Sequence, residues 1–393
     1  MKIVAHYLKS PFLSLTETWI YRQIINLKRY EPIVYCHGVF NRESFPIKRL
    51  RNVHVTNCPF PKRILGKINR HLWKWNLARA MNKDRPTIVH AHYGPSGYAF
   101  LPLKRTFCVP MVTTFYGYDV NMLPTQEPIW RERYYDLFKE GDLFLAEGGH
   151  MKKCLLEWGC NTNKVIIQHL GVDVEKIRFQ PRILDKDEEL RVLISGSFRE
   201  KKGIPYAIEA IGLFRAKQPK TKIKVTLIGD AGAQQREKTE KTRIVDAIRK
   251  HGLEQHTNCI GYQPHQVFLE QLLKHHIFLS PSVTAHDGDT EGGAPVSIIE
   301  ACASGMPVLS THHCDIPEAV IDGESGLLVP ERDTVALAEK LEYLATHDRE
   351  WPTIGLRGRI HVEENYSTKM QNDKLESIYD RLTSINRTNG DTI

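Results

Sequence analysis

Residues 287–330 read DGDTEGGAPVSIIEACASGMPVLSTHHCDIPEAVIDGESGLLVP. The apolar run IFLSPS stands just before this stretch and predicts a strand, so the glycine-rich loop DGDTEGGA opens at the carboxyl end of that strand. Pro295 then occupies the position expected for the first residue of a helix. In α/β sheets, ligands bind where strands end and helices begin, so the stretch predicts a binding loop.

The same alternation of short apolar runs and longer helical segments extends through the whole chain. Strands separated by helix-length segments, many ending in glycine, indicate repeated βαβ units around parallel sheets. The fold class is therefore α/β. The runs that predict strands are KIVAHYL, PIVYCHGV, TIVHAHYG, PMVTTFYG, DLFLAEGG, VLISGSF, KIKVTLIG, NCIGYQ, HIFLSPS and MPVLSTH.

The chain has 393 residues, more than the ~250 to 300 at which a single hydrophobic core stops growing, so we expect two domains. The charged segment 173–190 shows no sheet pattern, and we place the linker there. The C-terminal region looks helical on both sides of Tyr366 and Ser367, and a polar tail follows Leu382. Apolar residues make up 41% and charged residues 25%, which excludes a disordered chain, a collagen-like fibre and a coiled coil.

Signals for export or membrane insertion are missing from the sequence. His6 and Lys9 interrupt the apolar start before a signal-peptide core could form, and we expect a first strand there. No stretch approaches the ~18 apolar residues of a membrane-spanning helix. The eight cysteines form no C-x-x-C pair and no dense framework, which favours free thiols in a reducing compartment. We therefore expect a cytoplasmic protein.

The net charge of +8 is unevenly spread. Residues 1–185 hold 28 Lys and Arg against 15 Asp and Glu, whereas residues 186–393 hold 26 against 31. A helix over 62–81 would carry apolar residues on one face and Lys and Arg on another. Such a helix could rest on an anionic membrane at the inner face of the plasma membrane, or it could be an ordinary outer helix of the first sheet. No recognition motif accompanies the charge, so we expect no nucleic-acid partner.

Two further loops follow predicted strands in the second half of the chain. The strand VLISG is followed by SFREKKG, whose basic side chains are Arg199, Lys201 and Lys202. Free N–H groups, the helix dipole and ammonium charges at such a junction can hold a pyrophosphate, although a solvated basic turn has the same composition. The strand VTLIG is followed by GDAG at 229–232, where backbone could approach a ligand closely.

Two acids bracket the helix start in the stretch 287–330. Glu300 would lie about two turns into the helix, where its carboxylate can accept two hydroxyls of a ribose. Glu291, in the loop, would face whatever extends beyond the phosphates. The structural alternatives are a capping box of Ser297 with Glu300, which Pro295 weakens by making Ser297 the third helical residue, and a solvated loop acid at Glu291.

His90 and His92 stand two apart on one predicted strand and therefore on the same face. They lack a third partner at metal spacing, so we expect no metal site. The plain alternative is one packed histidine and one that faces a binding cleft.

The chain resembles the large retaining family of GT-B glycosyltransferases that contains sucrose synthases, phosphatidylinositol mannosyltransferases and many bacterial exopolysaccharide and lipopolysaccharide transferases. The segments that carry the resemblance follow the family order: LTETWIYRQI, VHAHYGPSG, TTFYGYDV, HLGVD, KKG, EGGAPVSIIEACASGMPV and ESGLLVP. An ordered set of motifs is specific, whereas each motif alone is not. The first of them is similar to the start of the exopolysaccharide branch.

The resemblance implies a GT-B fold, with two Rossmann-like βαβ domains that face each other across a cleft. Residues 1–180 would bind the acceptor, residues 186–365 would bind a nucleotide-sugar, and residues 366–393 would form a helix that crosses back to the N-terminal domain and a polar tail. The implied reaction moves a sugar, with a UDP-sugar favoured, to a hydroxyl of a saccharide or lipid-linked saccharide in cell-surface polysaccharide assembly. It would retain the anomeric configuration and require no metal or other cofactor.

The resemblance also implies roles for individual residues. Lys202 would contact the donor pyrophosphate, Glu300 the ribose, and Glu291 the transferred sugar. The full set implied for the donor is Gly196, Ser197, Arg199, Lys202, Gly229, Asp230, Gly261, Tyr262, Glu291, Gly292, Gly293, Ala294, Val296 and Glu300. The set implied for the acceptor is Ser14, Thr16, His92, Tyr116 and Asp119. The residues implied for catalysis are Glu291, Lys202, His92 and Tyr116.

The sequence departs from the family pattern at three places. The two glutamates are nine residues apart instead of the commoner eight. Ser197 stands where the family has an arginine, so phosphate binding would rest on Lys202, helped by Arg199. Tyr116 replaces the histidine of T-F-H-G-Y-D, and its hydroxyl can donate to a sugar or phosphate oxygen but cannot carry positive charge.

Cleavage of the anomeric C–O bond leaves negative charge on the phosphate, which Lys202, the glycine-rich amides and the helix dipole at Pro295 would meet. We expect same-face attack by the acceptor, because no carboxylate suited to a double displacement is evident. Three alternatives remain open: a nucleotide-sugar 2-epimerase of the same fold, a nucleotide-binding scaffold without catalysis, and a transferase whose metal is held by Asp287 and Asp289.

Overall fold

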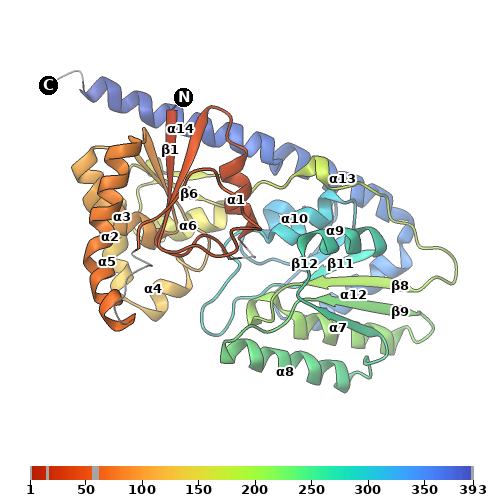
Figure 1. Ribbon diagram of the computed structural model, residues 1–393. Helices are drawn as coiled ribbons and strands as arrows, with labels where there is room; N and C mark the ends of the chain where they lie inside the picture. The colour runs from red at the N-terminus through yellow and green to blue at the C-terminus, as the bar shows by residue number, and fades with distance from the viewer. Residues whose placement is uncertain (1, 15–16, 55–61, 391–393) are drawn as a thin grey trace. The chain divides into compact units, whose positions relative to one another are not determined.

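The computed structural model describes residues 2–14, 17–54 and 62–390, with side chains described for 2–14, 17–54 and 72–384. The chain divides into two compact units, the first formed by Met1–Gly171 with Thr368–Ile393 and the second by Val172–Ser367. Each unit contains one parallel sheet flanked by helices (Figure 1). In the part of the chain that the structure describes, no helix combines the length and the apolar composition that a membrane span needs.

The first unit is built on a seven-stranded parallel sheet in the order β3-β2-β1-β4-β5-β6-β7. Its strands are β1 (Lys2–Leu8), β2 (Tyr30–Cys36), β3 (Leu50–Asn52), β4 (Ile88–His92), β5 (Met111–Thr114), β6 (Leu143–Ala146) and β7 (Val165–Ile167). Its helices are α1 (Thr18–Ile25), α2 (Lys62–Asp84), α3 (Gly94–Phe107), α4 (Met122–Gln126), α5 (Ile129–Glu140), α6 (Gly149–Glu157) and α14 (Thr368–Gly390). The strand order reverses between β1 and β4, which is where doubly wound sheets form a ligand crevice.

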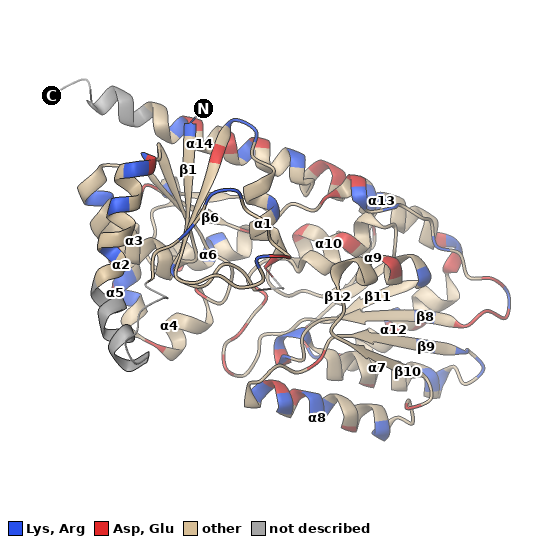
Figure 2. Ribbon diagram, viewed as in Figure 1, with Lys and Arg blue, Asp and Glu red and all other residues tan. Residues whose placement is uncertain are grey.

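The second unit repeats this plan with a six-stranded parallel sheet in the order β10-β9-β8-β11-β12-β13. Its strands are β8 (Leu190–Ser195), β9 (Ile223–Ile228), β10 (Thr257–Gly261), β11 (Ile277–Ser280), β12 (Val308–Thr311) and β13 (Gly326–Val329). Its helices are α7 (Ile204–Lys217), α8 (Gln235–Lys250), α9 (His265–Lys274), α10 (Val296–Ala303), α11 (Ile316–Ala319), α12 (Thr334–Thr346) and α13 (Trp351–Asn365). The order reverses between β8 and β11. Lys and Arg alternate with Asp and Glu along α8, as on a solvated helix (Figure 2).

Both faces of the first sheet are covered, which explains why its strands read as nearly continuous apolar runs. All residues of β4 are buried. On one face, Phe100 of α3 and Tyr134 of α5 join the core with Phe144 of β6. On the other face, Leu375 and Tyr379 of α14 close a separate cluster. The last helix of the chain is therefore a layer of the first unit.

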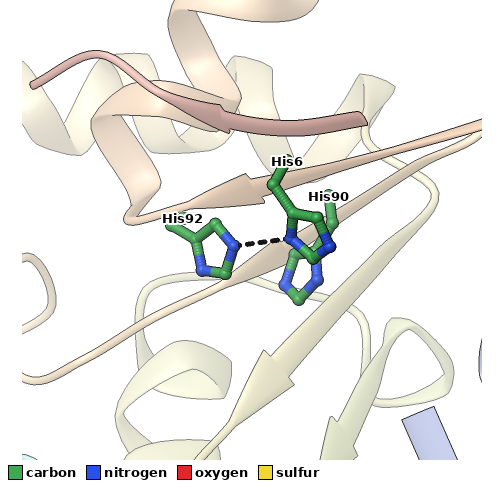
Figure 3. A group of neighbouring side chains, drawn as sticks. All are labelled: His6, His90 and His92. Atoms are coloured by element: carbon green, nitrogen blue, oxygen red, sulfur yellow. Dashed lines mark hydrogen bonds between the residues drawn. The ribbon is translucent and has the colours of Figure 1, made fainter. Parts of the chain in front are cut away.

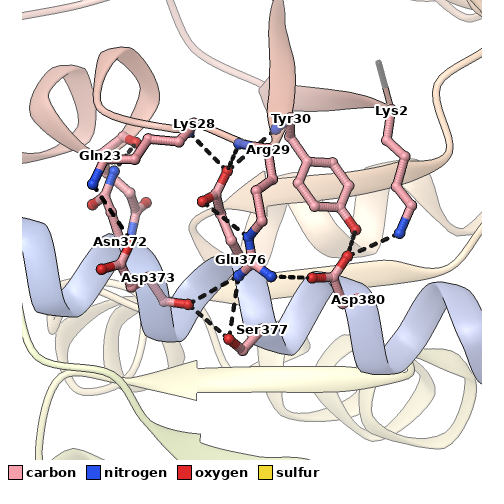
Figure 4. A network of polar contacts seen from close by, with 10 residues as sticks. All are labelled: Lys2, Gln23, Lys28, Arg29, Tyr30, Asn372, Asp373, Glu376, Ser377 and Asp380. Carbon is pink, nitrogen blue, oxygen red and sulfur yellow. Dashed lines mark hydrogen bonds and ion pairs between the residues drawn. The ribbon is translucent and has the colours of Figure 1, made fainter.

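Two acids hold α14 against the start of β2 (Figure 4). Glu376 is 1% exposed, and its Oε1 accepts the three backbone N–H groups of residues 28–30 at 2.5 to 3.2 Å. Asp380 accepts from Lys2 Nζ at 2.8 Å and from the Tyr30 hydroxyl at 2.9 Å. Buried backbone N–H groups need acceptors, and the residues before β2 find theirs on a helix far along the chain.

The segment 173–190, expected to be a linker, packs on the second unit. Arg182 is 3% exposed, and its guanidinium donates to the backbone carbonyls of Leu272 and His275 at 2.6 and 2.9 Å. A buried guanidinium needs such acceptors, so these bonds hold the segment in place. The chain leaves the first unit at Gly171, earlier than the expected boundary at 180, and returns to it at Thr368.

Each run of sequence expected to form a strand does contain one. The pattern did not predict β3 and β7, which have three residues each, or β13 within the stretch 287–330. The expected helices on both sides of Tyr366 and Ser367 are confirmed as α13 and α14. Helix α14 continues to Gly390, beyond Leu382, where the polar tail was expected to begin.

Candidate active site

Two loops of the second unit meet where its strand order reverses. Lys202 ends a short 3₁₀ turn (Glu200–Lys202) that follows β8, and Glu291 lies in the loop that follows β11. Lys202 Nζ lies 2.9 Å from Glu291 Oε2. The structure therefore brings these two residues together at the reversal, which is where doubly wound sheets bind ligands.

Glu291 is enclosed by donors and cations. Its side chain is 5% exposed, the Ser282 hydroxyl donates to Oε1 at 2.8 Å, and Lys201 Nζ lies 3.9 Å from Oε2. Burial raises the pKa of this carboxyl, but the ammonium groups of Lys202 and Lys201 outweigh burial and lower the pKa to about 2. Glu291 is therefore an ionised, buried carboxylate, and the alternative of a solvated loop acid is wrong.

Close packing explains the glycines of these loops. A Cβ at Gly196 would lie 3.1 Å from Cδ of Lys202, so this glycine leaves room for the lysine stem. Gly229 has φ 133°, and a Cβ there would lie 1.9 Å from the carbonyl oxygen of Gly196. Gly203 has φ 63°, and a Cβ there would lie 1.8 Å from the carbonyl oxygen of Pro281. Gly229 and Gly203 admit no side chain because the loops after β8, β9 and β11 touch one another there.

The acids of the alternative metal motif are paired with cations. Arg199 donates to Asp289, and Lys201 Nζ lies 3.3 Å from the other oxygen of that carboxylate. Asp287 accepts from Arg236 Nη1 at 2.8 Å. Burial lowers the pKa of Lys201, a shift that the neighbouring carboxylates oppose. Each of the two acids therefore faces cations of the protein itself, which disfavours the metal motif.

Glu300 lies on α10, a little more than one turn after Val296, rather than the expected two turns into the helix. Pro295 directly precedes the helix and carries no side-chain cap, and the capping box expected as an alternative does not form because Ser297 already lies inside the first turn. The Glu300 side chain is 3% exposed, and its Oε1 lies 2.9 Å from Nε2 of His265, the first residue of α9. A buried carboxylate next to a partly open imidazole can bind neighbouring hydroxyls.

The remaining residues expected at the donor line the same edge of the sheet. Gly261 ends β10, and Tyr262 after it is 54% exposed. Asp230, after β9, accepts from Lys241 Nζ at 2.6 Å, and this ion pair lowers the pKa of the carboxyl. Ser197 follows Gly196 in the loop after β8. The loop residues expected to meet the sugar are Gly292, Gly293 and Ala294, which lead to Val296 at the start of α10.

A chain of buried side chains lies at the carboxyl ends of β1 and β4 in the first unit (Figure 3). His6 Nδ1 lies 2.9 Å from His92 Nε2, and His92 Nδ1 lies 2.6 Å from the Tyr116 hydroxyl. Burial lowers the pKa of His92 and lowers that of His6 to about 3, so both rings are neutral at pH 7. His92 is fully buried, and its two ring nitrogens are engaged by His6 and Tyr116.

His90 joins the same cluster but has separate partners. Its ring nitrogens lie 2.6 Å from the hydroxyls of Tyr379 and Thr114. His6 supplies the third imidazole that the sequence pattern lacked, since one nitrogen of each of the three rings lies within 4.8 Å of the others. Both nitrogens of His90 are nevertheless engaged with hydroxyl groups, so the contacts are those of a hydrogen-bonded network.

The carboxylate of Asp119 accepts hydrogen bonds from the backbone. It is fully buried, and its two oxygens accept the N–H groups of Gly94 and Tyr116 at 2.7 and 2.9 Å. Burial raises the pKa of Asp119 to about 6. Burial also raises the pKa of Tyr116, which keeps its hydroxyl protonated. Asp119, expected at the acceptor, thus fixes the turn that carries Tyr116 and the start of α3.

Ser14, another expected acceptor residue, lies on the loop after β1. Ser14 is exposed, and its hydroxyl donates to Glu17 Oε2 at 2.9 Å. The second oxygen of Glu17 accepts the Tyr93 hydroxyl at 2.6 Å, which ties this loop to the end of β4. Thr16 lies outside the described residues.

Three residues that touch the two glutamates were not predicted from the sequence. Ser282 and His313 contact Glu291, and His265 contacts Glu300. Each follows one of the predicted strands, so its place at a strand's carboxyl end was a usable signal. What the pattern could not supply was the pairing, since Ser282 meets Glu291 within one folded loop, while His313 and His265 reach the glutamates from other elements.

Two family models match successive parts of the chain: glycosyl transferases group 1 matches residues 173–352, and glycosyltransferase family 4 matches residues 17–176. AmsK of Erwinia amylovora, an amylovoran biosynthesis glycosyltransferase, is 33% identical over 298 residues, which cover 75% of this chain and 70% of AmsK. WcaL of Escherichia coli strain K12, whose name describes a colanic acid biosynthesis glycosyltransferase, is 32% identical over 302 residues, 76% of this chain and 71% of WcaL.

Solved structures share the architecture. Sucrose-phosphate synthase of Thermosynechococcus elongatus has a TM-score of 0.79 at 16% identity and covers 98% of this chain and 100% of its own. HepE of Anabaena, in complex with UDP and glucose, has a TM-score of 0.76 at 15% identity and covers 97% of this chain and 100% of its own. At such identities the likeness concerns the fold, and it confirms GT-B. Together with the sequence relatives, these matches place the chain in the glycosyltransferase family of group 1 and family 4 enzymes.

Proposed function

We propose that this chain transfers a sugar from a nucleotide-sugar, with a UDP-sugar favoured, to a hydroxyl of a saccharide or lipid-linked saccharide in the assembly of a cell-surface polysaccharide. The observation that carries the proposal is the buried pair of Lys202 and Glu291 at the strand reversal of the second unit. The amylovoran and colanic acid relatives support the polysaccharide, and HepE with UDP and glucose supports the donor.

The proposed donor contacts follow from the charges at this edge of the sheet. Lys202 and the amides of the loop after β8 would bind the pyrophosphate, because a compact ammonium and free N–H groups suit phosphate oxygens. Glu300, next to His265, would accept the ribose hydroxyls. Glu291 and the amides near Ala294 and Val296 would contact the transferred sugar. Lys201 keeps the loop closed by donating to the carbonyl of Thr290 at 2.8 Å.

The proposed chemistry retains the anomeric configuration. As the anomeric C–O bond breaks, negative charge collects on the leaving phosphate, and Lys202 lies where it can stabilise that charge. Glu291 is held by Lys202 and Ser282, a position that suits contact with the sugar rather than attack on it. The acceptor hydroxyl would therefore attack from the face that the phosphate leaves, and the phosphate would take its proton. A covalent sugar adduct in mass spectra of the enzyme during turnover would overturn this route.

We further propose that the reaction needs no metal ion. Asp287 and Asp289, the acids of the alternative metal motif, are paired with Arg236, Arg199 and Lys201. The positive charges around the diphosphate would then come from the protein. Full activity after treatment with EDTA supports this view, and activity that returns only when Mg²⁺ or Mn²⁺ is added contradicts it.

The first unit would receive the acceptor near Ser14 and Tyr116, in a cytoplasmic protein that sits on the inner face of the plasma membrane. In the described part of α2, Trp75 is 60% exposed and Leu72 41%, while Arg79 lies 5.7 Å from the Trp75 ring centroid. Exposed apolar side chains next to cations suit an anionic lipid surface. Co-sedimentation with vesicles of anionic lipid at low salt, lost at high salt or in Trp75→Ser, tests this part.

The central experiment is a product assay. A thermal-shift panel of UDP, GDP and ADP first identifies the base, since a ligand that binds the folded protein raises its melting temperature. The matching nucleotide-sugars are then incubated with and without saccharide acceptors, and products are identified by mass spectrometry. Transfer to an acceptor supports the proposal. A new nucleotide-sugar without acceptor indicates the epimerase, and binding without turnover of any donor indicates the scaffold.

A further inference from the structure

The loop that carries Glu291 is held from behind by a histidine. The backbone N–H of Glu291 donates to Nε2 of His313 at 3.1 Å. His313 lies in the turn that follows β12 and is 1% exposed. The carboxylate of Glu291 points to Lys202 and Ser282, so His313 grips the backbone of the residue while its side chain faces the donor site.

The second nitrogen of His313 has an anionic partner. Nδ1 lies 2.6 Å from Oε1 of Glu331, which follows β13. Glu331 in turn accepts the backbone N–H of Thr284 at 2.8 Å, in the loop after β11. The contacts run from Thr284 through Glu331 and His313 to Glu291, and they tie together the loops at the carboxyl ends of three adjacent strands.

The contacts of the two His313 ring nitrogens are compatible with one tautomer. An ionised carboxylate can only accept a hydrogen bond, so the proton must sit on Nδ1, which faces Glu331. A neutral imidazole with its proton on Nδ1 has a lone pair on Nε2, and the Glu291 N–H points at that nitrogen. Cys314 Sγ lies 3.2 Å from the same nitrogen, and burial raises the pKa of this thiol to about 12, so the thiol keeps a proton that it can donate to Nε2.

We propose that His313 is a positioning residue for sugar transfer and that Glu331 selects its tautomer. The inference rests on the proposed function, in which Glu291 and the amides after it contact the sugar. The chain bends sharply just after Glu291, where Gly292 has φ 80°. Without an acceptor for the Glu291 N–H, this bend loses one of its fixed points, and the carboxylate would leave the geometry that the transition state requires.

A change at His313 should lower the rate of sugar transfer and leave UDP binding intact. His313 contacts neither Lys202 nor Glu300 among the hydrogen bonds of the described residues, so UDP should bind normally when His313 is changed. The sugar, which Glu291 contacts, should instead be misplaced. A misplacement of about 1 Å at a reacting centre can lower the rate by about a hundredfold.

The experiment compares His313→Met with His313→Gln in the full chain. Methionine fills the space without an acceptor at the Nε2 position, whereas the glutamine amide oxygen can take that position and accept the Glu291 N–H. We expect His313→Met to lower kcat by about ten- to a hundredfold with an unchanged Kd for UDP, and His313→Gln to recover most of the loss. Equal losses in both variants, or a weaker Kd for UDP that accompanies the loss of kcat, would overturn the inference.

An NMR measurement tests the tautomer independently of activity. Long-range ¹H–¹⁵N spectra distinguish protonated from unprotonated imidazole nitrogens, and the signal that disappears in His313→Gln identifies the residue. We expect a proton on Nδ1 in the native chain and a mixture of tautomers in Glu331→Gln. A proton on Nε2 in the native chain contradicts the proposal. If no donor supports transfer by the native chain, the proposed function fails, while the NMR result still decides the tautomer.

Discussion

Glu300 on α10 and His265 on α9 face each other, with 2.9 Å between the carboxylate Oε1 and the imidazole Nε2. The pair lies at the carboxyl end of the second sheet, where the loops after β10 and β11 begin. The carboxylate retains acceptor capacity for hydroxyl groups, since each of its oxygens can accept more than one hydrogen bond.

This geometry predicts a specific loss in Glu300→Ala. Native protein should bind UDP more tightly than an analogue that lacks the ribose hydroxyls, by about ten- to a hundredfold, because a hydrogen bond to a charged group contributes about 1.5 to 3 kcal/mol. Glu300→Ala should bind both ligands equally weakly. Isothermal titration calorimetry provides the measurement. A variant that still prefers the ribose hydroxyls would remove Glu300 from the site.

Substitutions of Lys202 and of Glu291 should have different effects on UDP binding. Lys202→Met should weaken UDP binding by about ten- to a hundredfold, because it removes the ammonium that we propose to contact the phosphates. Glu291→Gln should leave UDP binding unchanged or improve it, since a negative charge near the phosphates is lost, while kcat falls by about a hundredfold or more. Calorimetry and steady-state kinetics test both. Lys217→Met is the matched control, because Lys217 pairs with Glu342 on the surface between α7 and α12.

The buried Asp119 predicts a pH-dependent stability. Its pKa rises from 3.8 to about 6 on folding. Between these values the folded chain holds a proton that the unfolded chain has lost, so the free energy of unfolding falls as the pH rises through this window and is level above it. The contribution is on the order of 3 kcal/mol. Asp119→Asn should lack this fall, and urea unfolding from pH 4 to pH 7 measures it. Parallel curves for the native chain and the variant would contradict the assignment.

The chain of His6, His92 and Tyr116 predicts a stability effect from one oxygen atom. Tyr116→Phe leaves a nitrogen of His92 without its partner in a fully buried position. The expected loss in the free energy of unfolding is about 1 to 3 kcal/mol. Tyr135→Phe is the control, because Tyr135 is 65% exposed. If Tyr116 also donates to the substrate, Tyr116→Phe should lower kcat in addition, whereas unfolding alone reports the internal contact.

The fold followed from the sequence wherever local pattern decides structure. KIVAHYL forms β1 over the same seven residues, because a fully buried parallel strand shows itself as an apolar run. The strands β3 and β7 have no such run, since three residues on or near a sheet edge bury too little apolar surface. The segment 173–190 looked like a linker because its charges gave no sign that Arg182 would be buried among backbone carbonyls.

The candidate site divides in the same way. Glu291, Glu300 and Lys202 were predictable because each follows a predicted strand with a residue type suited to a nucleotide-sugar. Their partners His265 and His313 were not, because contacts between separate loops depend on how neighbouring strands are aligned. The three-histidine cluster shows the same limit: spacing placed His90 and His92 together, but only the pairing of β1 with β4 brings His6 to them.

Glu376→Ala should weaken the first unit without touching the second. It would remove the oxygen that accepts the backbone N–H groups of residues 28–30. The Tyr30 N–H is buried, and a buried unpaired N–H costs about 1 to 3 kcal/mol. Hydrogen exchange read by mass spectrometry should show faster exchange in β1 and β2 than in β8 and β9. Glu364→Ala, on the exposed side of α13, is the control. Equal acceleration in both units would argue against a local effect.

The position of α14 also bears on synthesis at the ribosome. Strand β2, which begins at Tyr30, hydrogen-bonds to helix α14, which begins at Thr368. The ribosome therefore translates the whole second unit before the first unit can be completed. Until then a nascent sheet displays the apolar face that Leu375 and Tyr379 will cover. We expect the second unit to fold first. The first unit would depend on chaperones until α14 has been synthesised.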